Sequence, residues 1–229
     1  MQSFSRLMKA PVVALWHLVL PPTCLACQAV MHGDGHLSLC PACWAHMPRF
    51  YIEQQPACQL MLNDAPFTSF EAPFLYDGLT PTLVKNLKYR DQHAGVPFMA
   101  QAMVPYLPRE ADVLVPVPMP RRRLLQRKYN QACLLARALS RQVGTPWQWD
   151  GLTRKGKAGR QVGKTAAERR KQLKNAFVAD PRLAGKHVVL IDDVLTTGST
   201  AAACTQALLR VGVRQVDVRT FAYVPPDSQ

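Results

Sequence analysis

Acidic residues are scarce in this sequence, and it contains no long hydrophobic run. Only 15 Asp and Glu stand against 28 Lys and Arg, so the formal net charge is +13, which favours polyanionic partners such as nucleic acid or polyphosphorylated ligands. The apolar stretch Pro11–Leu20 holds only 10 residues, whereas a transmembrane helix needs about 20. No small-x-small cleavage site precedes Cys24, so a secretory signal peptide is not indicated. We therefore expect a cytoplasmic protein without membrane insertion.

The length of 229 residues leaves room for one ordinary domain and a small appendage. The composition changes from Phe67 onward, because cysteines cluster before this residue and alternating apolar segments follow it. The sequence shows no internal repeat and no low-complexity tail. We therefore predict an N-terminal helix and zinc-binding module over residues 1–66, and a larger domain over residues 67–229.

Five of the seven cysteines lie between Cys24 and Cys58, and four of these form two Cys-x-x-Cys pairs. The pairs are Cys24 with Cys27 and Cys40 with Cys43, separated by 12 residues. Two such pairs bring four thiolates within reach of one tetrahedral Zn²⁺, which a reducing cytosol favours over disulfides. We predict a structural zinc site that supplies folding energy to the small module. The alternative is reduced cysteine without metal, and whether Cys58 joins a metal site stays open.

The most informative segment of the chain is Val188–Thr200. Its first four residues are β-favouring and apolar, which predicts a strand buried on both faces. Two carboxylates follow, then a turn of small and hydroxyl-bearing residues, then an alanine-rich start of a helix. The backbone N–H groups of such a turn and the positive end of the helix dipole bind a phosphate, and glycine lets the backbone approach it closely. The predicted phosphate-binding residues are Thr196, Thr197, Gly198, Ser199 and Thr200.

Asp192 and Asp193 stand where this strand is expected to end. Carboxylates repel a phosphate, but they suit sugar hydroxyls and a hydrated Mg²⁺. A phosphate, a ribose and Mg²⁺ in one pocket indicate a phosphoribosyl group, and the segment resembles the phosphoribosyl pyrophosphate (PRPP) signature of type I phosphoribosyltransferases. The alternative is that the two carboxylates only cap the turn at the end of the strand.

Strand patterns alternate with helical patterns from Phe67 onward. Strands are predicted over residues 74–76, 113–118, 188–191 and 216–223, and helices over residues 79–87, 96–107, 129–143 and 200–211. This alternation implies a parallel sheet with right-handed crossovers, whose ligands bind at the carboxyl ends of the strands. We therefore predict an α/β fold with a type I phosphoribosyltransferase-like parallel sheet flanked by helices, next to a small N-terminal zinc-binding module.

Basic residues gather in two segments that flank the predicted polyphosphate site. Arg121–Lys128 follows the first core strand, and we predict that Arg121 binds pyrophosphate beside the Pro116–Pro120 loop. In the second segment, Gly151–Lys174, Glu168 is the single acid, and its glycines indicate a loop that closes over the site. A solvated surface is the alternative, and aromatic residues that would stack on bases are not interleaved here. The predicted nucleic-acid-binding residues are Arg169, Arg170 and Lys171.

These motifs together resemble the ComF family over nearly the whole chain. The resemblance is carried, in order, by the two cysteine pairs, Val115-Pro116-Val117-Pro118, Tyr129-Asn130-Gln131-Ala132, Gln161, Glu168-Arg169-Arg170, Asn175-Ala176-Phe177 and the Asp192–Thr200 string. Family members often have Arg-Gly-Phe-Asn-Gln where this chain has Arg-Lys-Tyr-Asn-Gln, and a further cysteine pair where it has only Cys58. The resemblance implies the type I phosphoribosyltransferase fold, binding of PRPP with Mg²⁺, and a role in handling imported single-stranded DNA in bacterial competence and DNA utilisation.

Three functions remain open from the sequence. The first is a DNA uptake and processing factor that keeps a PRPP pocket, with competence proteins such as a DNA helicase as possible partners. The second is an active phosphoribosyltransferase with a nucleobase-like acceptor, in which Asp192 and Asp193 are catalytic. The third is an interaction scaffold whose zinc module docks a partner. The lack of a recognisable base-specificity loop favours the first function over the second.

Overall fold

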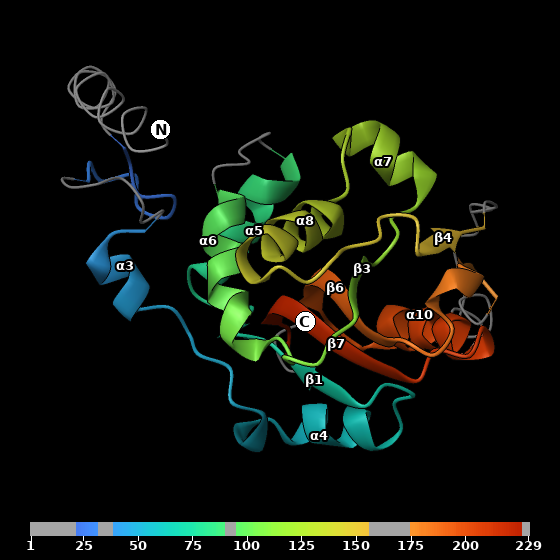
Figure 1. Cartoon of the computed structure of the whole chain (residues 1–229). Helices are drawn as coiled ribbons and strands as arrows, with labels where there is room; N and C mark the ends of the chain where they lie inside the picture. The colour runs from blue at the N-terminus through green and yellow to red at the C-terminus, as the bar shows by residue number, and fades with distance from the viewer. Residues whose placement is uncertain (1–21, 32–38, 90–94, 156–174, 226–229) are drawn as a thin grey trace, which may run out of the picture. The chain divides into compact units, whose positions relative to one another are not determined.

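The structure is a computed structural model that describes residues 22–31, 39–89, 95–155 and 175–225. The chain divides into two compact units, Met1–Met47 and Pro48–Gln229 (Figure 1). The predicted N-terminal helix and the predicted nucleic-acid-binding residues 169–171 lie outside the described residues. Of the helices in the described ranges, none combines the length and the apolar character needed to cross a membrane.

The described part of the first unit consists of a tight turn and a short helix. An antiparallel bridge between Thr23 and Val30 closes the turn. Helix α3 (Pro41–Ala45) begins after Cys40, whose sulfur accepts a hydrogen bond from the N–H of Cys43 at 3.5 Å. One cysteine pair therefore stands on the turn, and the other stands at the start of the helix.

The second unit is built on a parallel sheet with the strand order β1-β7-β6-β3, in which β2 also pairs with β7. The strands are β1 (Ser69–Glu71), β2 (Phe74–Leu75), β3 (Val113–Pro116), β6 (His187–Leu195) and β7 (Gln215–Tyr223). All residues of β3 and the first five of β6 are buried, as expected for apolar strands that are covered on both faces. This sheet and its flanking helices confirm the predicted fold class.

Helices cover both faces of the sheet (Figure 1). One face carries α5 (Thr80–Tyr89), α6 (Gly95–Met103) and α8 (Gln131–Val143). The other face carries α4 (Pro56–Asn63), α10 (Ser199–Arg210) and an antiparallel pair formed by β4 (Leu152–Arg154) and β5 (Phe177–Ala179). The described part of this unit also contains short elements: α7 (Arg121–Arg127) and the 3₁₀ helices η1 (Ile52–Gln54), η2 (Val104–Tyr106) and η3 (Pro181–Leu183).

Strand β6 is longer than the predicted strand 188–191, because it continues through the carboxylate pair to Leu195. Its partner β7 runs beside it over this whole length and still pairs Val194 with Ala222. On its other edge, β3 ends at Pro116 opposite Ile191. The carboxylates thus lie within a strand at the point where one of its two edges loses its partner.

Residues 48–66, predicted as part of the zinc-binding module, pack on the sheet of the second unit. Phe50 and Cys58 are buried in its core. The Phe50 ring lies 5.3 Å from that of Tyr223 and 5.6 Å from that of Phe70, measured between ring centroids. The compact units accordingly divide after Met47, while the predicted boundary follows residue 66.

A buried polar network joins β1, β6 and β7 near their amino ends. The Asp217 carboxylate accepts hydrogen bonds from Ser69 Oγ at 2.8 Å and from His187 Nε2 at 2.6 Å. The buried Arg219 donates to Ser69 Oγ at 2.9 Å, and burial lowers the pKa of its guanidinium. Since these groups are shielded from water, each depends on the others for its hydrogen bonds.

We expect Asp217→Ala to lower the free energy of unfolding by about 3–5 kcal/mol, because buried partners lose their carboxylate. Asp150→Ala is the control, since Asp150 pairs at 3.0 Å with Arg182, whose side chain is 68% exposed; this change should have an effect below about 1 kcal/mol. Urea unfolding followed by circular dichroism measures both. Equal midpoints for the two variants would show that the network does not stabilise the sheet.

Candidate ligand-binding site and metal centre

A cleft of about 840 Å³ opens where β3 and β6 end, which is where parallel sheets bind their ligands. The Pro-rich loop after β3, residues 117–120, forms one wall, and the turn after β6 contributes another. The cleft is lined by five of the residues predicted from the signature segment, Asp192, Asp193, Thr196, Thr197 and Thr200. The structure therefore brings the predicted carboxylates and most of the predicted hydroxyls together.

The turn after β6 has the features of an anion site. Gly198 has a φ of 68° and precedes α10, and this left-handed conformation favours glycine. The hydroxyls of Thr197 and Ser199 hydrogen-bond to each other at 3.0 Å. The first N–H groups of α10 and the positive end of its dipole follow directly. Gly198 and Ser199 line a second hollow behind the turn instead of the cleft.

The two carboxylates of the signature differ in their burial. Asp193 is 8% exposed and Asp192 is half-buried, and both line the cleft. The Asp193 N–H donates to Asp192 Oδ1 at 2.9 Å, which is a local capping bond of the kind that the alternative interpretation predicts. Burial first, and then the charge of Asp192, raise the pKa of the buried Cys204 thiol. Both carboxylates also meet the cleft, where they offer the hard oxygen ligands that Mg²⁺ and sugar hydroxyls accept.

A second helix, α8, begins at the same cleft. Asn130 caps it by accepting from the Ala132 N–H at 3.1 Å, and it donates to the Val117 carbonyl at 2.9 Å. Gln131 is 2% exposed, and its Oε1 accepts from Arg127 Nη1 at 3.5 Å. Among the described residues, Gln131 Nε2 has no hydrogen-bond partner. A buried donor of this kind is destabilising by about 1–3 kcal/mol until an acceptor meets it, so the cleft is suited to a ligand with acceptor oxygens.

Four arginines line the cleft: Arg122, Arg123 and Arg127 from α7, and Arg154 from β4. The Arg154 guanidinium lies 5.3 Å from the ring centroid of Phe177, its neighbour across the β4–β5 pair, and burial lowers its pKa. The predicted pyrophosphate ligand Arg121 is exposed and does not line the cleft. Because the basic run forms a helix, only the arginines on one of its faces reach the cleft, and Arg121 is not among them.

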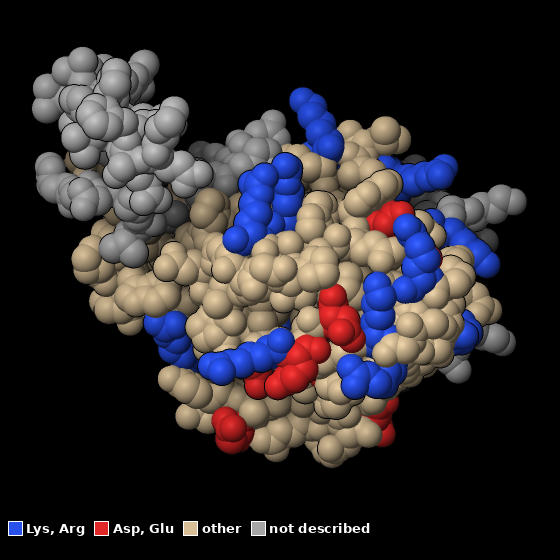
Figure 2. All heavy atoms as spheres, in the orientation of Figure 1, with Lys and Arg blue, Asp and Glu red and all other residues tan. Residues whose placement is uncertain are grey.

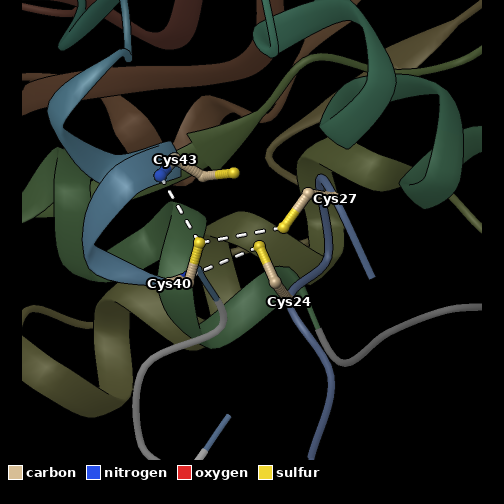
Figure 3. A group of neighbouring side chains, drawn as sticks. All are labelled: Cys24, Cys27, Cys40 and Cys43. Atoms are coloured by element: carbon tan, nitrogen blue, oxygen red, sulfur yellow. Dashed lines mark hydrogen bonds between the residues drawn. The ribbon is translucent and has the colours of Figure 1, made fainter. Parts of the chain in front are cut away.

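The four predicted zinc ligands, Cys24, Cys27, Cys40 and Cys43, form a compact cluster (Figure 3). Their sulfur atoms all lie within 4.8 Å of one another, and those of Cys27 and Cys40 are 3.8 Å apart. Tetrahedral Zn–S bonds of about 2.3 Å require sulfur separations of roughly 3.8 Å. The cluster therefore fits a closed four-sulfur zinc site.

The thiols of this cluster differ in acidity. Burial opposes ionisation of Cys24, but hydrogen bonds from the backbones of Cys27, Cys40 and Ala26 lower its pKa to about 6. Burial and the neighbouring cysteines raise the pKa of Cys43 to about 12. Four thiolates repel one another at this distance, and a divalent cation at their centre offsets that repulsion.

Cys58 and Cys133 lie outside the cysteine cluster, in helices of the second unit. Cys58 is fully buried in α4, and burial raises its pKa to about 11; burial raises the pKa of Cys133 to about 11 as well. Within the described residues, Cys58 belongs to no group of three or more metal-ligating side chains. These cysteines therefore behave as small apolar residues.

Several cleft residues escaped prediction from the sequence. Gln131 follows an Asn cap at the start of a helix, a position that hints at a polar role but does not show that the side chain is buried. Tyr76 reaches the cleft from the end of β2, whereas Arg154 belongs to the basic segment 151–174 that was predicted to flank the site, and its pairing with Phe177 places it there. No local pattern marks Tyr76 as a cleft residue.

Two family models match the chain. The model of the double zinc ribbon domain matches residues 15–65, and the model of the phosphoribosyl transferase domain matches residues 130–227. The first match contains the cysteine cluster. The second contains α8, the carboxylate pair and the turn before α10.

Curated relatives match about half of the chain. DNA utilization protein YhgH of Escherichia coli (strain K12) is 41% identical over 107 residues, which cover 47% of each protein. Competence protein F of Haemophilus influenzae is 37% identical over 110 residues, which cover 47% of this chain and 48% of that protein. The chain is therefore homologous, over about half of its length, to these DNA utilization and competence proteins, and it matches the models of a double zinc ribbon domain and a phosphoribosyl transferase domain, which confirms the predicted resemblance.

Proposed function

We propose that the cleft binds PRPP together with Mg²⁺, and that this binding serves a role in DNA utilisation. The observation that carries the proposal is the meeting of two helix N-termini, those of α8 and α10, at one cleft with a carboxylate pair on the strand between them. Helix N-termini favour anions, and carboxylates favour hydroxyls and metal ions. PRPP has an anionic group at each end and a ribose in the middle.

The two anion sites suit different ends of this ligand. The turn after β6 offers three hydroxyls and the N–H groups of α10 to the terminal phosphate. The opposite end offers the arginines of α7 to the pyrophosphate, whose oxygens also supply the acceptor that Gln131 Nε2 lacks. This assignment transfers the pyrophosphate role from Arg121 to Arg123 and Arg127, which lie one helical turn apart.

Asp192 and Asp193 would hold the ribose hydroxyls and a hydrated Mg²⁺. The metal supplies positive charge that neutralises the pyrophosphate. Asp192 is half-buried and stays accessible to solvent, so that a hydrated metal ion can bind to it and leave. Asp193 is buried and forms the bottom of the pocket.

The double variant Asp192→Asn/Asp193→Asn should weaken binding of PRPP with Mg²⁺ at least tenfold, since it removes both anionic ligands and keeps the shape of the side chains. Isothermal titration calorimetry measures the affinity, and circular dichroism checks the fold. Asp150→Asn, at a residue that does not line the cleft, serves as the matched control. An unchanged affinity in the double variant would contradict the proposal.

The cysteine cluster supports a second part of the proposal, a structural Zn²⁺ in the first unit. We expect about one equivalent of zinc in protein purified under reducing conditions without chelator, because the four sulfurs form one closed site. Cys27→Ser should lower this content, whereas Cys133→Ser, in α8, should retain it. Less than half an equivalent of zinc in the parent protein would rule out the site.

The role in DNA rests on the relatives and on charge. The relatives carry the names DNA utilization protein and Competence protein. Lys and Arg outnumber Asp and Glu on the face shown in Figure 2 and gather over the side that carries α7, β4 and α10. Phosphate contacts from such a surface bind single strands with little sequence preference. We infer that single-stranded DNA follows the basic segments 121–128 and 154–174.

The triple variant Arg169→Ala/Arg170→Ala/Lys171→Ala should weaken the binding of single-stranded DNA of all sequences about equally. It should also flatten the slope of log affinity against log salt by about 2, because each phosphate contact on a single strand contributes about 0.7. Fluorescence anisotropy over a salt series measures both quantities. Arg137→Ala/Arg141→Ala, which changes two exposed arginines of α8, is the control. If the triple variant loses PRPP binding but keeps the DNA affinity and slope, the DNA surface lies elsewhere.

An active phosphoribosyltransferase is the second candidate function. It is favoured by the carboxylate pair itself, which can hold the ribose while positive charge develops at the anomeric carbon and pyrophosphate departs. A pyrophosphate-release assay with PRPP, Mg²⁺ and a panel of bases, with and without single-stranded DNA, separates the two functions. Release that depends on a base supports the transferase, and binding without release supports a PRPP-binding factor.

A further inference from the structure

Behind the turn that joins β6 to α10 lies a second hollow of about 380 Å³. Its walls come from two distant parts of the chain. One wall is formed by Met61 and Asp64 at the end of α4 and by Phe67, and the other by Thr197, Gly198 and Ser199. Thr197 lines both this hollow and the cleft. The turn is thus a thin partition with the ligand site on one side and α4 on the other.

Met61 is in close contact with this partition. A Cβ placed on Gly198 would lie 2.6 Å from Met61 Sδ, which is closer than such atoms approach, and 3.4 Å from its Cγ. The thioether therefore rests against the backbone of the turn at its one residue with positive φ. Methionine is suited to fill such an irregular gap.

The helix that carries Met61 is firmly held. Cys58, one turn earlier in α4, is 0% exposed and belongs to the same buried core cluster as Tyr223 at the end of β7. The Phe50 ring packs on the same tyrosine at 5.3 Å. Leu60, which neighbours Met61, is 67% exposed and does not belong to the core cluster. Helix α4 is therefore fixed to the sheet, and Met61 is the residue of α4 that contacts the turn.

The turn itself has few internal restraints. Thr196 and Thr197 are exposed. Within the described part of the chain, the hydrogen bonds of the turn are the one between Thr197 and Ser199 and the helical bond from Ala202 N–H to the Gly198 carbonyl at 2.8 Å. A short segment that must present several N–H groups to one phosphate binds best when it is ordered beforehand. External packing supplies that order here.

We propose that Met61 is a positioning residue for the anion-binding turn, which it holds in its ligand-ready conformation from behind; this inference rests on the proposed function of the cleft. The support comes from outside the region matched by the phosphoribosyl transferase model. Residue 61 lies within the part matched by the double zinc ribbon model, residues 15–65. The N-terminal part of the chain thus takes part in forming the ligand site.

Three variants of the full chain test the proposal. Met61→Ala removes the contact, Met61→Leu restores most of its volume, and Leu60→Ala is the matched control on the exposed side of α4. Hydrogen exchange of the amides of residues 196–202 is measured without ligand, and PRPP affinity with Mg²⁺ is measured by calorimetry. We expect Met61→Ala to speed exchange in the turn and to weaken PRPP about fivefold, which corresponds to a competent turn in about one fifth of the molecules. Met61→Leu and Leu60→Ala should stay within about twofold of the parent protein.

The two readouts separate this inference from the proposed function. If the parent protein does not bind PRPP, the proposed function fails, and exchange in the turn still decides whether Met61 positions it. Unchanged exchange in Met61→Ala overturns the inference, and so does faster exchange with an unchanged PRPP affinity. Faster exchange spread over β6 and β7 as well would indicate general destabilisation and would also overturn it.

Discussion

The end of β3 at Pro116 is the constraint on which the site depends. Proline has no N–H for the sheet, and after a last bond from the Val117 N–H to the Ile191 carbonyl at 2.9 Å the strand becomes a Pro-rich loop. β6 loses its partner on that edge but keeps β7 on the other. The N–H of Asp193 then has no strand partner on this edge, and it donates to the Asp192 carboxylate instead. A sheet that ends unevenly thus creates the cleft and places the acids in its floor.

The charge of the site follows from this geometry. Two carboxylates on a central strand would repel a phosphorylated ligand if they stood alone. Four arginines and two helix N-termini surround them, so the positive groups form the walls and the negative groups form the floor. This separation lets one cleft accept anionic ends and a polyol centre at the same time. Four of the basic residues that give the sequence its positive net charge therefore line this cleft.

The parts of the site that sequence analysis predicted are those encoded by neighbouring residues. The conformation of the turn around Gly198 and the geometry of the four cysteines depend on residues close together in the sequence. The spacing of these residues was therefore sufficient to predict both features. The length of β6 was underestimated because its last residues depend on β7. The choice among the arginines of α7 depends on the rotation of a helix that the charge run does not reveal. The basic run identified Arg154 only as one of many candidates, since its place in the cleft depends on a contact with Phe177. The contact of Met61 with Gly198 joins distant segments, which no local pattern encodes.

The place of β7 in the sheet also has a consequence for how the chain acquires its fold. β7 is the last strand in the described sequence, yet it lies between β1 and β6, and Ser69 bonds with Asp217 across 148 positions of sequence. During synthesis, β1 and β6 therefore emerge from the ribosome before the strand that joins them, with their edges open. Folding of this unit is delayed until β7 has been synthesised, and such a high contact order makes it slow. The growing chain is thus most prone to aggregation in the interval before β7 inserts.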